Sequence, residues 1–133
     1  MTDYRWLTQA MVEAFHRESI ARFGGSDGIR DPGLLESALA RPRNRAAYEE
    51  SASPFALAAE YTLGIVRNHP FVDGNKRSGI LAGAVFLSIN GCDFEPEETA
   101  IVQMIVGLAA SEVDETVLTE WFQEFSKLRE ADV

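Results

Sequence analysis

The chain has 133 residues, of which 46% are hydrophobic and 25% are charged, an ordinary composition for one soluble globular domain. We therefore predict a single domain over residues 1–133, large enough to bury one core. The formal net charge of −9 argues against a nucleic-acid-binding protein, because such proteins carry a basic stripe. We expect no direct nucleic-acid partner.

Cysteine usage and hydropathy argue against a disulfide-bonded, zinc-binding, secreted or membrane-spanning protein. Cys92 is the only cysteine, so an intrachain disulfide is impossible, and the two histidines lie too far apart to favour a zinc site with it. Because Cys92 follows a helix-ending glycine, we interpret it as a buried or half-buried thiol. No basic region and long apolar run open the chain, and no apolar run reaches membrane-spanning length. We therefore expect a cytoplasmic protein with no membrane contact.

Capping residues and apolar periodicity predict an all-α fold, a compact bundle of about six helices. The first helix is expected over about 9–23, after the N-cap candidate Thr8. It contains His16, which we interpret as a half-buried structural histidine rather than a functional one. The second helix is predicted to begin after Asp31 and to end at Pro42, because proline disrupts a helix interior.

Two apolar helices are predicted in the middle of the chain. Ser53 is an N-cap candidate for a helix over 54–68, which is apolar nearly all round and therefore central and buried. A similar helix is expected over about 75–90. Gly79 and Gly83 lie four residues apart in it, which favours a close approach to a neighbouring helix.

The last third of the chain predicts two more helices. Residues 92–96 are expected to form a turn or a very short extended piece. Glu97 opens an apolar helix with an acidic first turn, which suits the helix dipole. A last helix is predicted from about Asp114, with Lys127 and Arg129 in its final turn.

The most informative stretch, residues 69–79, joins the two central helices and reads His-Pro-Phe-Val-Asp-Gly-Asn-Lys-Arg-Ser-Gly. Pro70 keeps His69 out of helical geometry, and Gly74 permits a tight turn. The polar residues therefore lie in a loop that runs into a helix N-terminus. Unpaired backbone N–H groups and the helix dipole favour anions there, so the stretch predicts a phosphate site.

The side chains of this loop suggest chemical roles. Asp73 is its one carboxylate, and one carboxylate with phosphate oxygens is a common way to hold Mg²⁺. His69 is suited to accept a proton from an attacking hydroxyl. Together these features predict transfer of a phosphorus-centred group from a nucleotide to a hydroxyl. The residues expected to hold the nucleotide phosphates are Gly74, Asn75, Lys76 and Arg77.

The same stretch resembles the signature of the Fic/Doc family, His-Pro-Phe-x-Asp/Glu-Gly-Asn-x-Arg. Most Fic proteins have glycine between the Asn and the Arg, whereas this chain has Lys76, as in the Doc (death-on-curing) branch. The similarity extends from about Leu7 to Gly91 and includes residues 22–42. Two departures are Ser78, where threonine is common, and Gly74, where some Doc proteins have alanine.

This resemblance implies a function. Most Fic proteins transfer AMP to a hydroxyl of a target protein, whereas Doc toxins bind the nucleotide in the reverse sense and phosphorylate elongation factor Tu. The chain is thus expected to be a kinase-like toxin that uses Mg²⁺ and ATP, with His69 as the base and Phe71 as an anchor in the core. The alternatives are AMP transfer, which Lys76 disfavours, and a non-catalytic binding module.

The resemblance also bears on regulation. Many Fic proteins silence themselves with a helix carrying Ser/Thr-x-x-x-Glu-Gly/Asn, but no Glu in this chain is followed by Gly or Asn. We therefore expect a separate, Phd-like antitoxin that binds in trans. Fic-type folds also hold their target beside a flap, and by position residues 43–51 are the candidate, with an ordinary solvated connection as the alternative.

Overall fold

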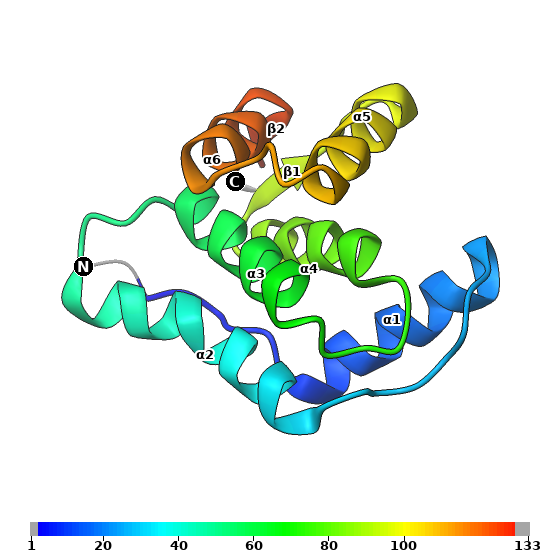
Figure 1. The fold of residues 1–133 in the computed structure, drawn as a ribbon. Helices are drawn as coiled ribbons and strands as arrows, with labels where there is room; N and C mark the ends of the chain where they lie inside the picture. The colour runs from blue at the N-terminus through cyan, green and yellow to red at the C-terminus, as the bar shows by residue number, and fades with distance from the viewer. Residues whose placement is uncertain (1–2, 130–133) are drawn as a thin grey trace.

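The computed structural model describes residues 3–129, and within them the chain forms six helices and one two-stranded ribbon (Figure 1). The all-α prediction is confirmed. The elements in chain order are α1 (Gln9–Phe23), α2 (Pro32–Tyr48), α3 (Pro54–Asn68), α4 (Asn75–Ile89), β1 (Cys92–Phe94), α5 (Glu98–Ala109), α6 (Glu115–Glu124) and β2 (Ser126–Leu128).

The buried pair α3 and α4 forms the centre of the fold, with α1 and α2 on one side and α5 and α6 on the other (Figure 1). The two helices approach closely because α4 presents glycines to its neighbours. A Cβ atom at Gly79 would lie 3.0 Å from the Thr62 carbonyl oxygen of α3. At Gly83 it would lie 2.5 Å from Cζ of Phe122 in α6. The Thr62 hydroxyl also donates a hydrogen bond to the Gly79 carbonyl (2.8 Å), which fixes the two helices in register.

Helix α2 does not end at Pro42 as the sequence predicts. Pro42 lies inside it and is buried, and the helix continues to Tyr48. A proline there removes the hydrogen-bond donor for the Ala38 carbonyl. Gly64 of α3 packs against this carbonyl so closely that a Cβ at position 64 would lie 3.2 Å from its oxygen. Tertiary packing therefore overrides the local preference.

The prediction of a flap at residues 43–51 is consequently wrong, because most of this stretch is helical. Ion pairs hold the last turns of α2 to the core. Glu60 of α3 is buried and lies within ion-pair distance of Arg41 (3.3 Å) and Arg45 (3.6 Å). Arg45 also bonds Glu115 of α6, so this end of α2 is packed against two helices.

The C-terminal end of the described chain also differs from the prediction. Helix α6 ends at Glu124, and Lys127 lies in strand β2, which pairs antiparallel with β1. Strand β1 confirms the expected short extended piece. Its Phe94 ring packs on Phe122 of α6, with ring centroids 5.0 Å apart, so the ribbon is anchored to the core. Cys92 of β1 is buried, as expected.

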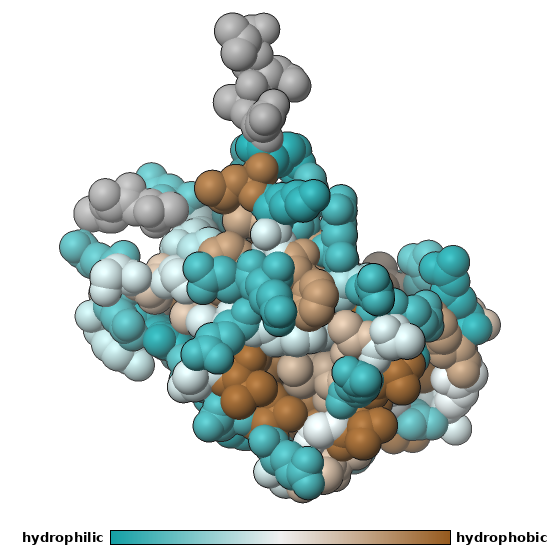
Figure 2. Space-filling view, turned by 90° about the horizontal axis from the view of Figure 1, so that it is seen from above, coloured by the Kyte–Doolittle hydropathy of each residue, from teal (hydrophilic) through white to brown (hydrophobic). Residues whose placement is uncertain are grey.

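Helix α5 is apolar on more than one face. It places Met104 and Leu108 in the core, while Val102 and Val106 remain exposed. Figure 2 shows apolar residues on the face of the molecule that carries α5 and α6. Within residues 3–129, no helix combines the length and the apolar character needed to cross a membrane.

Candidate active site

The motif loop starts at His69, which is the C-cap of α3 and has a left-handed backbone with φ of 52° and ψ of 53°. Pro70 disfavours the right-handed helical region for His69, and the backbone N–H of His69 still donates to Ile65. A left-handed conformation costs a non-glycine residue about 1–2 kcal/mol. The imidazole is exposed at this turn, so the surrounding contacts must stabilise its position.

A short extended segment, residues 28–31, pairs with the motif loop in antiparallel fashion through a bridge between Ile29 and Phe71. The Arg30 N–H donates to the Pro70 carbonyl (2.7 Å), and the Val72 N–H donates to Gly28 (3.0 Å). The extended neighbour of the motif is therefore this segment and not residues 43–51. Sequence reasoning missed it, because an isolated bridge leaves no periodic pattern.

Asn75 organises the loop from inside. The residue is only 3% exposed. The Oδ1 atom accepts from the Phe71 N–H (3.0 Å), and Nδ2 donates to the Phe71 carbonyl (3.0 Å). Nδ2 also lies 3.1 Å from Nδ1 of His69. In this structure the amide thus joins the two ends of the loop, whereas the sequence suggested a phosphate donor.

The contact between Asn75 and His69 determines which ring nitrogen of the neutral His69 carries the hydrogen. The Phe71 N–H can only donate, so it fixes Oδ1 of Asn75 on its side and leaves Nδ2 facing His69. Nδ1 of His69 must then accept, and the neutral ring carries its hydrogen on Nε2. Accepting a proton at Nε2 requires the other tautomer, in which this hydrogen bond is absent.

The N-terminus of α4 offers unpaired donors. Gly74 is its N-cap, with φ of 75°, and within the described residues no side chain caps this end. The first-turn N–H groups of Asn75, Lys76 and Arg77 have no carbonyl in the preceding turn to bind, so they can donate to an anion. A Cβ at Gly74 would lie 3.0 Å from Cδ1 of Ile20, so a side chain at this position would have to displace the end of Ile20 and adopt a φ of 75°.

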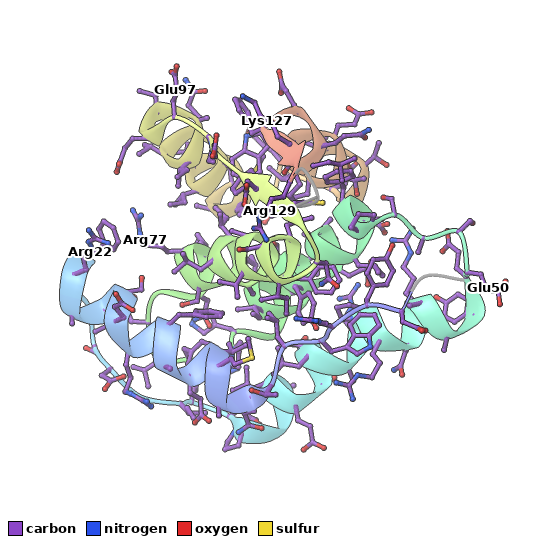
Figure 3. All side chains as sticks on the ribbon, turned by 180° about the vertical axis from the view of Figure 1, so that it is seen from behind. Arg22, Glu50, Arg77, Glu97, Lys127 and Arg129 are labelled. Carbon is purple, nitrogen blue, oxygen red and sulfur yellow. The ribbon has the colours of Figure 1, made fainter. Side chains whose placement is uncertain are left out.

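Arg77 packs on an aromatic ring that sequence reasoning did not single out. Its guanidinium carbon lies 3.8 Å from the ring centroid of Phe23, the last residue of α1. Arg22 lies 5.9 Å from the same ring. Figure 3 shows Arg22 and Arg77 together at this end of α1. Positive charge therefore gathers beside the α4 N-terminus in a chain whose formal net charge is −9.

Asp73 is exposed and held by the backbone. Its Oδ1 accepts from the Gly74 N–H (2.9 Å) and its Oδ2 from the Ser26 N–H (3.2 Å). A Cβ at Gly25 would lie 2.8 Å from Oδ2, so glycine at that position leaves room for the carboxylate. Each carboxylate oxygen keeps a further lone pair for a cation.

This donor set fits Mg²⁺ only in company with a ligand. Among residues 3–129, no group of three His, Cys, Asp or Glu side chains could hold a metal ion. Mg²⁺ commonly binds one or two carboxylates together with substrate phosphates and water. Asp73, one residue before the N-cap of α4, is the one carboxylate of the motif loop and is placed for such a role.

Behind the loop lies His16 of α1, which is fully buried at 1% exposure rather than half-buried as the sequence suggested. Its ring stacks on Phe71, and Nδ1 lies 2.8 Å from the Ser78 hydroxyl of α4. Burial lowers the pKa of His16, and the nearby carboxylates of Asp27 and Asp73 partly offset that effect. Phe71 is itself completely buried and so fixes the loop in the core.

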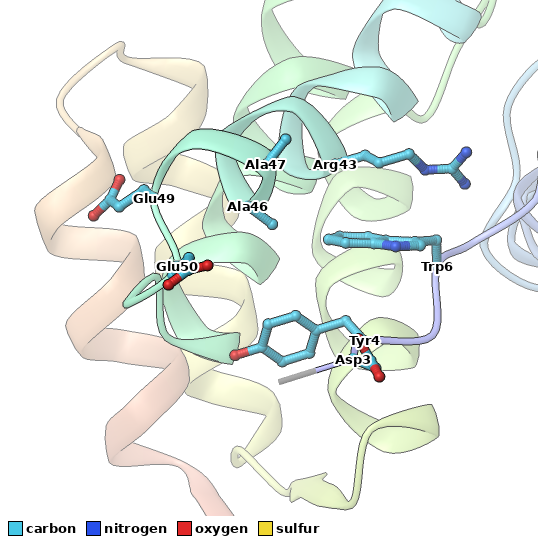
Figure 4. A pocket seen from close by; sticks show the side chains of 8 residues that line it. All are labelled: Asp3, Tyr4, Trp6, Arg43, Ala46, Ala47, Glu49 and Glu50. Atoms are coloured by element: carbon cyan, nitrogen blue, oxygen red, sulfur yellow. The ribbon is translucent and has the colours of Figure 1, made fainter. Parts of the chain in front are cut away.

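A separate hollow of about 440 Å³ lies at the C-terminal end of α2, away from the motif loop. Figure 4 shows Tyr4 and Trp6 of the N-terminal segment opposite Ala46 and Ala47 of α2. The guanidinium of Arg43 lies over the Trp6 ring at 5.8 Å from its centroid. No residue of the motif loop lines this hollow.

Comparison with known proteins identifies the family. Residues 6–87, which include α1 to α3 and most of α4, match the Fic/DOC family. The chain is 38% identical over 110 residues to "Protein kinase doc" of Escherichia phage P1, covering 82% of this chain and 86% of that protein. It is 41% identical over 88 residues to "Toxin Doc" of Mycolicibacterium smegmatis, covering 61% and 67%. This chain therefore belongs to the Fic/DOC family.

Proposed function

We propose that this protein is a Doc-type toxin that transfers the γ-phosphoryl group of ATP to a Ser or Thr hydroxyl of elongation factor Tu. The observation that carries the proposal is the short loop that joins α3 to α4. It begins with the exposed His69 and ends at the N-terminus of α4, which no side chain of the described residues caps. A proton acceptor and an anion site are thereby held on the same short loop. One relative is named as a protein kinase, which supports the phosphoryl transfer, and the other is named as a toxin, which supports the biological role.

In this proposal the phosphates bind at the first turn of α4. The backbone N–H groups donate to phosphate oxygens, and Lys76 and Arg77 balance the negative charge. Gly74 keeps the turn free of a side chain. The acceptor oxygen forms a bond to the γ-phosphorus, the bond from phosphorus to the bridging oxygen breaks, and ADP leaves with the electron pair.

His69 accepts the proton of the attacking hydroxyl. With the observed contact to Asn75, the neutral ring must first change its tautomer so that Nε2 is free. Asn75 would then release Nδ1, and its Nδ2–H could turn to a bound phosphate. The two interpretations of Asn75, loop organiser and phosphate donor, thus describe successive states of one side chain.

Asp73 would hold Mg²⁺ together with the phosphate oxygens. The ion would supply positive charge that screens the phosphates from the incoming nucleophile. The contacts from Gly74 and Ser26 keep the carboxylate beside the α4 N-terminus before any ligand arrives.

The test uses purified protein, Mg²⁺, elongation factor Tu and ATP labelled at either the α or the γ phosphate. Label that reaches the factor only from the γ position supports the proposal. Label from the α position means AMP transfer, the alternative chemistry of the Fic branch, and refutes the role assigned to Lys76. The His69→Ala variant should bind ATP but transfer no label. A variant that retains full function would indicate a non-catalytic binding module.

The proposal includes a protein partner that controls the toxin. A relative is named as a toxin, and no Glu of this chain is followed by Gly or Asn, so we propose a Phd-like antitoxin that binds in trans. The proposed target places the reaction in the cytoplasm. Expression of the chain should arrest growth, and co-expression of the antitoxin should restore it. Arrest that persists with the antitoxin would contradict this part of the proposal.

A further inference from the structure

Arg30, a residue outside the motif, binds the end of helix α3 where the motif begins. Its Nε donates to the carbonyl of His69 (2.7 Å), and its Nη2 donates to the carbonyl of Asn68 (3.0 Å). The backbone N–H of the same residue donates to the carbonyl of Pro70 (2.7 Å). One arginine therefore binds three successive carbonyl groups, and the middle one belongs to the proposed base.

The physical need for this contact follows from the helix end. The last carbonyls of a helix have no donors within it, and the negative end of its dipole attracts a cation. At the end of α3 the backbone also turns into the left-handed conformation at His69, so the carbonyl of His69 cannot take part in a continued helix. A guanidinium group meets both requirements, because its planar fork donates two hydrogen bonds in fixed geometry and keeps its charge.

We propose that Arg30 is a positioning residue for His69, an inference that rests on the proposed function for its catalytic consequence. Arg30 does not need to touch the nucleotide or the acceptor. It holds the backbone of His69 in the left-handed conformation, and Asn75 holds the ring of the same residue from the other side. Before the ring changes its tautomer, His69 is thus held at its backbone by Arg30 and at Nδ1 by Asn75. After the change, the contact of Arg30 with the backbone remains.

The role differs from that of a core residue, because the Arg30 side chain is exposed. In the described chain its side-chain hydrogen bonds go only to the end of α3. The backbone bridge of its segment to the loop does not depend on the side chain. Removal of the guanidinium should therefore displace His69 and leave the fold intact.

The test compares Arg30→Ala and Arg30→Lys with the wild-type protein and with Arg5→Ala, an exposed arginine near the N-terminus. Both Arg30 variants should lower kcat by about 10- to 100-fold, because a small displacement of a catalytic group is enough for such a loss. The KM for ATP and the melting temperature should not change. Guanidinium ion at millimolar concentration should partly restore Arg30→Ala but not His69→Ala.

A second measurement does not depend on activity. In NMR spectra, Arg30→Ala should shift the backbone and ring resonances of His69, while Arg5→Ala should not. If the wild-type protein transfers no phosphoryl group, the proposed function fails, and the NMR comparison still tests the role of Arg30. Unchanged His69 resonances, or a loss of ATP affinity as large as the loss of kcat, would overturn the inference. If Arg30→Ala does not fold, the same criteria apply to Arg30→Lys.

Discussion

The imidazole of His16 lies flat on the ring of Phe71, with centroids 3.7 Å apart and an angle of 11° between the planes. His16 belongs to α1 and Phe71 to the motif loop, so this stack joins the first helix to the candidate active site. His16 also reaches the Ser78 hydroxyl in α4. The protonation state of a buried side chain is thereby coupled to the position of the loop.

This coupling predicts a pH dependence of stability. Burial lowers the pKa of folded His16, so the unfolded chain binds the proton first as the pH falls. The stability contributed by neutral His16 is complete above its unfolded pKa of about 6.5 and declines below that value. Urea denaturation at pH 7.5 and 5.5 should therefore show a larger loss for the wild type than for His16→Asn.

The exposed histidine serves as the control for this experiment. His69→Gln should keep the pH dependence of stability seen in the wild type, because this variant still contains the buried ring of His16. Equal losses for the wild type and His16→Asn would show that His16 does not carry the effect.

The approach of Asp73 to the backbone predicts an effect of Gly25→Ala on Mg²⁺. A Cβ there would lie 2.8 Å from Oδ2 of Asp73 and would push the carboxylate away. Gly24 is a matched control, because it also has a positive φ but has no atom within 4 Å of its would-be Cβ. Both alanine variants should lose stability from the backbone alone, by about 1–3 kcal/mol, because both positions have a positive φ that side chains disfavour.

Only Gly25→Ala should raise the Mg²⁺ concentration needed for half-maximal phosphoryl transfer. A titration of the reaction rate with Mg²⁺ measures this directly. The same shift in Gly24→Ala would mean that loop strain, and not the displacement of Asp73, is responsible.

The packing of Arg77 on Phe23 predicts a role for an aromatic residue outside the motif. Loss of an exposed cation–π contact costs about 0.5–1 kcal/mol, so Phe23→Ala should weaken ATP binding by about two- to fivefold. Phe23→Trp should bind ATP as well as the wild type or better. Isothermal titration calorimetry can measure all three affinities. Equal affinities for the alanine and tryptophan variants would show that Phe23 does not orient Arg77.

The close packing of α4 predicts a large loss of stability for Gly83→Ala. The added methyl group would meet Cζ of Phe122 at 2.5 Å and the Ala58 carbonyl oxygen at 3.1 Å. Overpacking of this kind costs about 1–3 kcal/mol. Gly33→Ala in the first turn of α2 is the control, because its Cβ would make only an ordinary contact at 3.4 Å.

Chemical denaturation would measure both variants. Phe122→Leu should recover part of the loss in the Gly83→Ala background, because the shorter side chain no longer reaches the methyl group. A Gly83→Ala protein as stable as the wild type would contradict the proposed reason for this glycine.

The sequence by itself determined the helices and the place of the motif, because both depend on local interactions. Thr8, Asp31 and Ser53 each accept a hydrogen bond from the backbone N–H three residues later, as their positions before apolar runs predict. The loop between the two central helices was equally visible, since Pro70 and Gly74 carry their backbone preferences with them.

Only the tertiary structure decided what surrounds that loop. Arg30, His16 and Phe23 come from segments far away in the chain, and nothing near them in sequence signals a contact with the motif. Pro42 is a case in which the local preference was visible but misleading. Its tendency to end a helix is overridden by packing of α2 against α3. Local backbone preferences extend over one helical turn, whereas the site is built from contacts between residues brought together by the core.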